Sequence, residues 1–336
     1  MNKYLITGFS GFVGRHFVEY LKNNEKNCLV KGLDIQNPDF KFDHSENVKI
    51  SFEKIDLLSK EQVECIIQKF QPNYILHLAS YSSVAYSWKE PVQSFQNNTN
   101  IFLNLIDAVR KLNINTRILS IGSSEEYGNV KDEDLPLKED HKLNPVSPYA
   151  VARISQEYLS GVYIDGYGMD LVLTRSFNHI GPMQKSVFVV SSLAKQLVEI
   201  KKSGKNKGNI VTGDVSIVRD FTDVRDVVHA YYLLLKDGKK GHTYNVCSGI
   251  GLSIKEILDI MAKQLNMEVD TNIDNLLIRP ADNRKIIGSN EKIKRELGWQ
   301  NNIPLEQSLK DVICYWETNS LVGSGIESGG NKGNNL

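Results

Sequence analysis

Two side chains that could move a proton stand four residues apart. Tyr149 and Arg153 are separated by Ala-Val-Ala, and a helix would place both on one face. A phenol can deliver or remove a proton at a substrate oxygen when a nearby cation lowers its pKa toward neutrality. A tyrosine and an arginine at this spacing also occur as a simple surface pair, so other residues are needed to identify a site.

A segment upstream supplies candidates. The string 122–128, Gly-Ser-Ser-Glu-Glu-Tyr-Gly, follows the strand-like run 117–121. In open parallel sheets, ligands bind at the carboxyl ends of the strands. This hydroxyl-rich segment therefore joins Tyr149 and Arg153 as a candidate part of the same site.

A glycine-rich turn predicts a dinucleotide site. The string 8–14, Gly-Phe-Ser-Gly-Phe-Val-Gly, follows the strand-like run 4–7 and opens a helical pattern. Glycines allow a tight turn and a close approach of the backbone, so a pyrophosphate can sit on the helix N-terminus. The residues of this turn that we assign to cofactor binding are Gly8, Gly11, Phe12, Val13 and Gly14.

The choice between cofactors rests on Asp34, which ends the second strand-like run, 20 residues after Gly14. A carboxylate there accepts hydrogen bonds from the adenosine ribose 2′-hydroxyl and would repel a 2′-phosphate. We therefore predict NAD(H) rather than NADP(H), although a nearby arginine could modify that preference. Asp56 and Leu57 follow the third strand-like run and could reach the adenine, but Asp56 could also be a surface-turn residue.

The order of the elements predicts the fold. Short apolar runs alternate with helical patterns, which favours a parallel sheet with helices on both faces. We expect an α/β fold built on a Rossmann-type, doubly wound parallel sheet. The strand-like runs are 4–7, 28–33, 48–52, 74–78 and 117–121, and the helical patterns are 17–21, 63–70 and 101–109.

Past about residue 178 the pattern loosens. We expect an NAD(H)-binding domain over 1–177, to which later segments return, and a smaller, mixed, interleaved substrate-binding region over 178–320. The elements expected there are helices at 189–200, 224–235 and 253–265, strands at 210–212 and 244–246, and a polar loop at 201–209. The Gly-, Ser- and Asn-rich stretch 321–336 lacks an apolar period and is expected to be a disordered tail.

Composition argues against several classes of protein. The 40 Lys and Arg residues balance 40 Asp and Glu residues, so the net charge is zero and no basic field would attract nucleic acid. No stretch approaches the roughly 18 consecutive apolar residues that membrane insertion needs, and the N-terminus lacks the shape of a signal peptide. The four cysteines show no CxxC spacing. We therefore expect no metal site, reduced thiols and a cytoplasmic location.

The glycine turn, Asp34, Ser123 and the pair of Tyr149 and Arg153 together resemble the extended short-chain dehydrogenases/reductases that modify nucleotide-sugars. The resemblance covers about residues 1–318. Four longer strings resemble the GDP-mannose branch of that family, at 81–88, 175–182, 218–226 and 244–249. They are most similar to its GDP-4-keto-6-deoxy-D-mannose reductases, and the GDP-mannose 4,6-dehydratases are close relatives.

The resemblance implies roles for individual residues. Ser123 would hydrogen-bond the sugar O4, and Tyr149 would be the acid or base at that oxygen. Asn98 falls where the family places an asparagine near the catalytic helix. The other residues implied are Leu78, Ala79, Asn98, Tyr149 and Arg153 for the cofactor, and Ser83, Ser123, Asn178, Arg219 and Arg279 for the substrate.

The two substrate arginines have alternative explanations. An arginine fork suits a nucleotide diphosphate because it bonds phosphate oxygens bidentately. Arg279 directly precedes Pro280 and could instead be a plain loop cation. Arg219 stands beside Asp220 and could form a structural ion pair.

One position departs from the family, because Arg153 stands where the family normally carries lysine. Arginine keeps the charge that favours a tyrosinate and can still donate to the nicotinamide ribose. It cannot release a proton at accessible pH, so a proton relay that depends on lysine is in doubt. An alternative is a catalytically weak protein that binds NAD(H) and a nucleotide-sugar.

Two reactions remain open. Glu125 occupies the position of the glutamate that 4,6-dehydratases use at C5, whereas 181–185 replaces their arginine-rich segment. The reductases also carry an acidic residue near this position, so Glu125 decides little. We favour NAD(H)-dependent reduction of GDP-4-keto-6-deoxy-D-mannose to GDP-D-rhamnose or its C4 epimer, by a homodimer or homotetramer that serves surface-polysaccharide synthesis. The alternative is GDP-mannose 4,6-dehydration with a bound, recycled NAD.

Overall fold

The computed structural model describes residues 1–42, 45, 47–281 and 283–319, so the tail expected at 321–336 lies outside the described residues. The first half of the chain forms β1 (Asn2–Thr7), α1 (Phe12–Asn24), β2 (Cys28–Asp34), β3 (Val48–Lys54), α2 (Lys60–Phe70), β4 (Tyr74–His77), α3 (Val84–Lys89), α4 (Pro91–Lys111), β5 (Arg117–Ser123), the 3-10 helices η1 (Ser124–Tyr127) and η2 (Asp132–Asp134), α5 (Pro148–Tyr167) and β6 (Asp170–Ser176). The second half forms β7 (Asn178–Ile180), α6 (Val189–Lys202), β8 (Lys207–Thr212), β9 (Val218–Asp223), α7 (Val224–Asp237), β10 (Thr243–Val246), β11 (Gly251–Ser253), α8 (Ile254–Gln264), β12 (Glu268–Ile273), η3 (Asn275–Leu277), β13 (Lys285–Ile286), α9 (Glu291–Leu297) and α10 (Leu305–Asn319).

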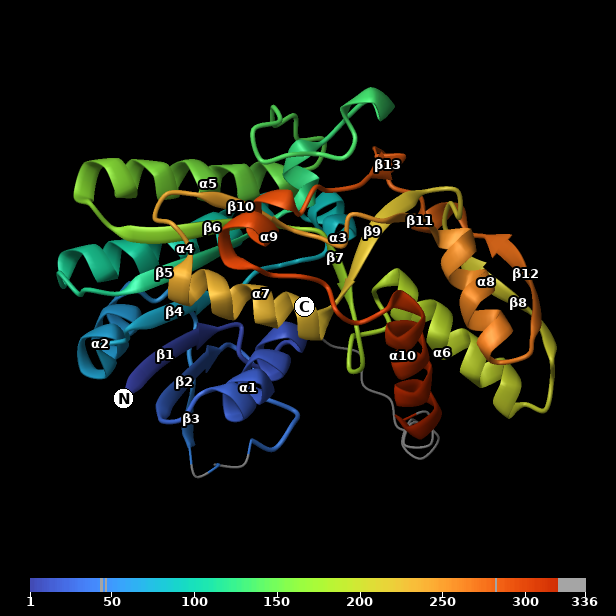
Figure 1. The fold of residues 1–336 in the computed structure, drawn as a ribbon, viewed down its shortest axis with the longest axis horizontal. Coiled ribbons are helices and arrows are strands. Elements are labelled where there is room, and N and C mark those ends of the chain that lie inside the picture. Colours follow the sequence, from blue (N-terminus) through green and yellow to red (C-terminus); the bar gives the residue numbers. More distant parts are fainter. Residues whose placement is uncertain (43–44, 46, 282, 320–336) are drawn as a thin grey trace.

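The larger sheet has seven strands in the order β10-β6-β5-β4-β1-β2-β3 (Figure 1), and every pairing in it is parallel. This arrangement confirms the predicted Rossmann-type, doubly wound sheet. The strand order reverses between β1 and β4, and ligands of such sheets bind outside the carboxyl ends of the strands at that point. The glycine turn follows β1, and Leu78 and Ala79 follow β4, so both flank the switch point.

Different helices cover the two faces of this sheet (Figure 1). Side chains alternate along β1, so Tyr4 and Ile6 pack on the side of α1 and α7, whereas Leu5 packs on the side of α2 and α4. All three side chains have 0% exposure. A strand buried on both faces carries a nearly continuous apolar run, here Tyr4 to Ile6, which explains why this strand was recognisable in the sequence.

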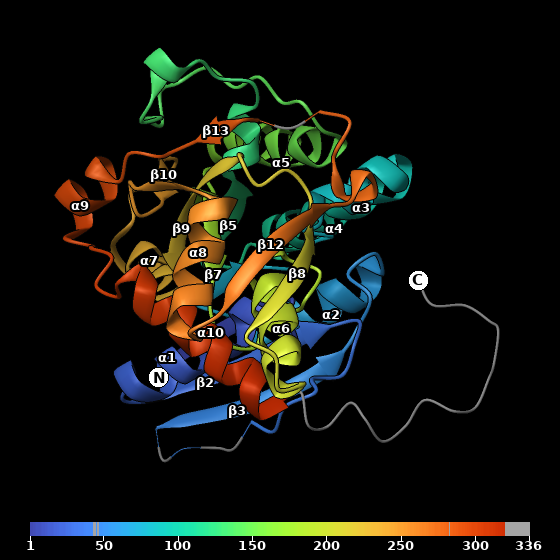
Figure 2. The same cartoon turned by 90° about the vertical axis from the view of Figure 1, so that its right-hand side faces the viewer.

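The remaining strands make a smaller, mixed arrangement, as predicted. In a four-stranded sheet, β9 pairs parallel with β7 and β13 and antiparallel with β11, and β8 and β12 form a separate parallel pair. Figure 2 shows α6, α8 and α10 beside these strands. The three helices share one apolar core that includes the fully buried Leu197, Met261 and Leu309.

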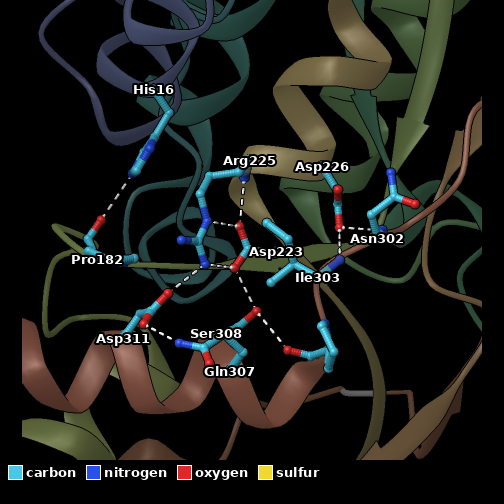
Figure 3. Close-up of polar contacts among 11 residues, drawn as sticks. His16, Pro182, Asp223, Arg225, Asp226, Asn302, Ile303, Gln307, Ser308 and Asp311 are labelled. Carbon is cyan, nitrogen blue, oxygen red and sulfur yellow. Dashed lines mark hydrogen bonds and ion pairs between the residues drawn. The ribbon is translucent and has the colours of Figure 1, made fainter.

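A polar cluster fastens α10 to the start of α7 (Figure 3). Arg225 donates to both carboxylate oxygens of Asp223, at 2.8 and 2.7 Å, and to Asp311 of α10 at 2.7 Å. Ser308 of α10 donates to the same Asp223 at 2.6 Å. Asp226 accepts two backbone N–H groups from the segment just before α10, both at 2.9 Å. Helix α10 is therefore anchored on a helix that covers the larger sheet.

Two details differ from the sequence-based expectations. The stretch 201–209 was predicted to be a loop, but β8 already begins at Lys207 because its backbone pairs with β12. The sequence predicted no helix beyond residue 265, where the structure has α9 and α10. All three elements, β8, α9 and α10, pack against segments distant in the chain rather than showing a strong local pattern.

Candidate active site

The glycine turn leaves no room for side chains. Gly8 has a φ of +68°, and a Cβ there would lie 2.8 Å from the backbone nitrogen of Ala79. A Cβ on Gly14 would lie 2.6 Å from the carbonyl oxygen of Phe9. The residue at the N-cap of α1 is Gly11, and no described side chain caps the helix there. The first N–H groups of α1 are thus available to an anion, so the turn fits the pyrophosphate of a dinucleotide.

Asp34 lies against this turn at the end of β2. Its Oδ2 accepts the N–H of Ser10 at 2.9 Å, and its Oδ1 accepts the N–H of Gln36 at 3.1 Å. These bonds fix the carboxylate beside the first turn of α1. The nearby arginine is Arg15, whose guanidinium carbon lies 4.9 Å from the ring centroid of Phe40.

The other expected cofactor residues lie around the same edge. Phe12 and Val13 form the first turn of α1 and are half-buried. Ala79 donates its N–H to Thr7 Oγ1 at 3.2 Å, which ties the end of β4 to β1. Leu57 is buried, and Asp56 Oδ1 accepts the N–H of Leu58 at 2.9 Å, so that carboxylate also shapes a local turn.

Tyr149 and Arg153 form a buried pair, not a surface pair. They lie in the first turns of α5, and Arg153 Nε donates to Tyr149 Oη at 3.1 Å. Their exposed fractions are 6% and 5%. Arg153 Nη1 also donates to the carbonyl oxygen of Ile121 at 2.9 Å, and this bond ties α5 to β5 two residues before Ser123. The burial rules out the surface-pair alternative.

The positive charge of Arg153 also affects the pKa of His77, a buried residue of β4. Burial, and after it the positive charge of Arg153, lowers the pKa of His77 to about 3. His77 is therefore neutral, and its Nδ1 lies 2.9 Å from Thr7 Oγ1. Sequence analysis did not single out His77, which lies in the middle of an apolar run without a recognisable motif.

Ser123 ends β5, and both its hydroxyl oxygen and its backbone N–H are hydrogen-bonded to the residues that follow it. Its Oγ accepts the N–H of Glu125 at 3.2 Å, which leaves the hydroxyl proton available to a substrate oxygen. Its N–H donates to Glu126 Oε1 at 2.6 Å. Glu126 is completely buried, and burial together with the charge of Glu157 raises its pKa well above the usual range. Glu126 was missed by the sequence analysis, and its only signal was its place beside Glu125.

One residue of the region 178–320, Arg279, reaches this segment. Arg279 Nη1 lies 3.8 Å from Glu125 Oε1, so the loop before β13 meets the segment after Ser123. Arg219 is 6% exposed and donates to the carbonyl oxygens of Val218 and Asn283 at 3.0 and 2.7 Å. The structure brings Glu125 and Arg279 together, although they are far apart in the chain.

Arg219 and Asp220, which are both among the described residues, do not form the ion pair that the sequence suggested as an alternative. Asp220 instead accepts hydrogen bonds from Ser248, Gly249 and Gly288, at 2.6 to 3.3 Å. Burial raises its pKa to about 6. Asp220 thus organises the loop after β10, and it does not hold Arg219.

Three further expected residues have defined places. Asn98 is 1% exposed, and its amide accepts the N–H of Tyr81 at 2.7 Å and donates to the Tyr81 carbonyl oxygen at 3.2 Å. Asn98 therefore shapes the segment between β4 and α3. Ser83 caps α3 by accepting the N–H of Tyr86 at 3.1 Å. Asn178 begins β7 and is half-buried.

The described part of the chain has neither a candidate metal site nor a helix that could span a membrane. No group of three or more His, Cys, Asp or Glu side chains in residues 1–42, 45, 47–281 and 283–319 could hold a metal ion. Within the same residues, no helix combines the length and the apolar character needed to cross a membrane.

The parallel sheet and the glycine turn at its switch point are those of a doubly wound, dinucleotide-binding fold. Comparison with known families agrees, because the family described as GDP-mannose 4,6 dehydratase matches residues 5–312. The chain belongs to this family, within the NAD-dependent epimerases/dehydratases. It is a nucleotide-sugar enzyme of the reductase/dehydratase kind.

Individual relatives narrow the comparison. The chain is 31% identical over 313 residues to GDP-6-deoxy-D-mannose reductase of Pseudomonas aeruginosa, covering 93% of this chain and 96% of the relative. It is similar to the structure of RMD from Pseudomonas aeruginosa complexed with NADPH, with a TM-score of 0.81, 30% identity and coverage of 95% and 99%. It is also similar to Thermus thermophilus UDP-glucose 4-epimerase complexed with NAD, with a TM-score of 0.82, 27% identity and coverage of 94% and 99%. Of these two structures, the first is complexed with NADPH and the second with NAD.

Proposed function

We propose that this enzyme uses NADH to reduce the C4 carbonyl of GDP-4-keto-6-deoxy-D-mannose to GDP-D-rhamnose or its C4 epimer. The observation that carries the proposal is the buried hydrogen bond from Arg153 to Tyr149, which places a proton donor beside a fixed cation near the end of β5. Similarity to a GDP-6-deoxy-D-mannose reductase over 93% of the chain supports the choice of substrate.

The proposed chemistry uses three side chains. The nicotinamide, when bound, supplies a hydride to C4. Tyr149 Oη donates a proton to the C4 oxygen, and Ser123 donates a hydrogen bond to the same oxygen because its Oγ lone pair already accepts from Glu125. Arg153 stabilises the phenolate that remains after proton donation. In this scheme arginine serves as a fixed charge and does not itself release a proton.

In this proposal the cofactor and the GDP-sugar are bound by different parts of the chain. Residues 1–177, together with β10, hold the cofactor through the glycine turn and Asp34. The interleaved region 178–320 holds the GDP-sugar, with Asn178, Arg219 and Arg279 at the diphosphate and Ser83 at the sugar. The preference for NADH over NADPH rests on Asp34, whose carboxylate would meet a 2′-phosphate with like charge.

A second candidate is GDP-mannose 4,6-dehydration with a bound NAD. It is favoured by Glu125, two residues beyond Ser123, where a carboxylate could remove the C5 proton. Arg279 Nη1 lies 3.8 Å from Glu125 Oε1, within ion-pair distance of that carboxylate.

The deciding experiment uses the purified protein with two substrates. One sample receives GDP-4-keto-6-deoxy-D-mannose and NADH, and the other receives GDP-mannose without added reductant. Oxidation of NADH with formation of a GDP-6-deoxyhexose in the first sample is the expected result. Formation of a 4-keto sugar in the second sample would replace the proposal by the dehydratase, and binding of NADH without turnover of either sugar would indicate a catalytically weak binding protein.

A further inference from the structure

Arg153 has an unusually complete set of partners. A guanidinium has five N–H donors, and four of those of Arg153 are directed at acceptors in the described chain. Nε donates to Tyr149 Oη at 3.1 Å, Nη2 to Ser80 Oγ at 2.5 Å, and Nη1 to both Ile121 O and Gln156 Oε1 at 2.9 Å. A buried charge with 5% exposure needs such acceptors, because unpaired N–H groups are costly away from water.

Gln156 is the partner that no motif singled out. It lies three residues after Arg153 on α5 and is 2% exposed. Its Oε1 faces Arg153, while its Nε2 donates to Ser120 Oγ of β5 at 3.3 Å. Both the oxygen and the nitrogen of the amide are therefore hydrogen-bonded, and the side chain links strand β5 to the guanidinium.

The arrangement suits arginine and not lysine. Gln156 and Ile121 hold Nη1, and this fixes the rotation of the guanidinium so that its Nε faces Tyr149. A lysine ammonium ends about where the guanidinium carbon lies, one bond short of Nη1. A lysine at position 153 would then reach Tyr149 without the help of Gln156.

We propose that Gln156 is a positioning residue that holds the Arg153 guanidinium against Tyr149 Oη, and that it does so only because position 153 is arginine. The inference rests on the proposed role of Tyr149 as the proton donor. By bonding Nη1, Gln156 keeps the guanidinium turned so that its Nε stays 3.1 Å from Tyr149 Oη. Removal of this support displaces the charge from the phenol without removing the phenol itself.

The test is a double-mutant cycle with Gln156→Met and Arg153→Lys. Methionine conserves the shape of glutamine and removes both its acceptor and its donor. With Arg153 present, Gln156→Met should lower kcat for carbonyl reduction about tenfold, the effect of one lost hydrogen bond to a charged group. The alkaline limb of the pH profile should move upward by about one pH unit, because a displaced cation leaves the phenol protonated to higher pH. In the Arg153→Lys background, Gln156→Met should change neither quantity by more than about twofold.

Ser160→Ala is the matched control. Ser160 is also buried on α5, one turn beyond Gln156, and donates to the Gln156 carbonyl oxygen at 2.9 Å. Its removal should leave kcat and the pH profile unchanged. An equal fall in kcat whether position 153 is arginine or lysine, or an unshifted pH profile in Gln156→Met, would overturn the proposal.

A second readout needs no turnover. The absorbance of the Tyr149 phenolate is obtained during a pH titration by subtracting the matching Tyr149→Phe protein. Gln156→Met should raise the titration midpoint when position 153 is arginine and leave it in place when position 153 is lysine, and any other pattern contradicts the inference. If neither GDP-sugar is turned over, the proposed function fails, and this titration still decides the role of Gln156.

Discussion

Arg279 Nη1 lies 3.8 Å from Glu125 Oε1, so a cation of the proposed substrate region lies beside the carboxylate that follows the proposed catalytic serine. The two side chains are 32% and 12% exposed, which leaves the pair accessible to a ligand at this edge. Glu125 is also the residue that distinguishes the two candidate reactions. Its substitution therefore gives the first prediction.

Glu125→Gln should lower reduction of the 4-keto-6-deoxy substrate by about tenfold at most, because a reductase moves no proton at C5 and loses only local hydrogen bonding. In a dehydratase the same change removes an obligatory base and would nearly abolish turnover of GDP-mannose. Product analysis of wild type and variant with each substrate measures both effects. Conversion of GDP-mannose by wild type without NADH, lost in the variant, would contradict the reductase.

Tyr149→Phe should reduce kcat by about a hundredfold or more, since it removes the proton donor at the C4 oxygen. Arg153 would keep its bonds to Ser80, Ile121 and Gln156, so the cofactor site should stay intact. Steady-state kinetics and a fluorescence titration with NADH provide the two measurements. Weaker NADH binding with unchanged kcat at saturation would mean that Tyr149 is structural.

The enzyme should prefer NADH to NADPH by at least about tenfold in dissociation constant, or about 1.4 kcal/mol. Asp34→Ala should reduce the difference between the dissociation constants of NADH and NADPH, because it removes the carboxylate proposed to face the 2′ position of the adenosine ribose. Asp39→Ala is the control, since Asp39 is an exposed aspartate of the same segment and its loss changes the net charge equally. Equal or tighter binding of NADPH by the wild type would show that Arg15, and not Asp34, dominates the site.

Arg225→Met should destabilise the protein by about 2 kcal/mol, because it leaves the fully buried carboxylate of Asp223 without its cation. Asp311→Asn removes only the outer partner of Arg225, which is 23% exposed, and should cost less than about 1 kcal/mol. Urea unfolding of the two variants in parallel tests the ranking. Equal losses would mean that the contact with α10, and not the buried carboxylate, carries the stability of this cluster.

The sequence alone determined the parallel sheet, the glycine turn after β1 and the chemical types at the candidate site. These features are local, because a strand buried on both faces has a nearly continuous apolar run and a glycine turn occupies consecutive residues, Gly8 to Gly14. The pair of Tyr149 and Arg153 was predicted for the same reason, since the spacing of a helix sets which residues share a face.

Only the tertiary structure decided which partners these residues have. Arg153 reaches Ser80, 73 residues away, and Ile121, 32 residues away, and the sequence could not distinguish this buried network from a surface pair. Arg219 binds backbone carbonyl groups, and carbonyl groups are present at every residue and leave no trace in the sequence. Helix α10 was missed because Leu309, Val312 and Ile313 form a weak local pattern that becomes stable only against α6 and α8. Contacts between distant segments depend on how whole helices and strands pack together. The spacing of neighbouring residues predicts local structure but does not determine this packing.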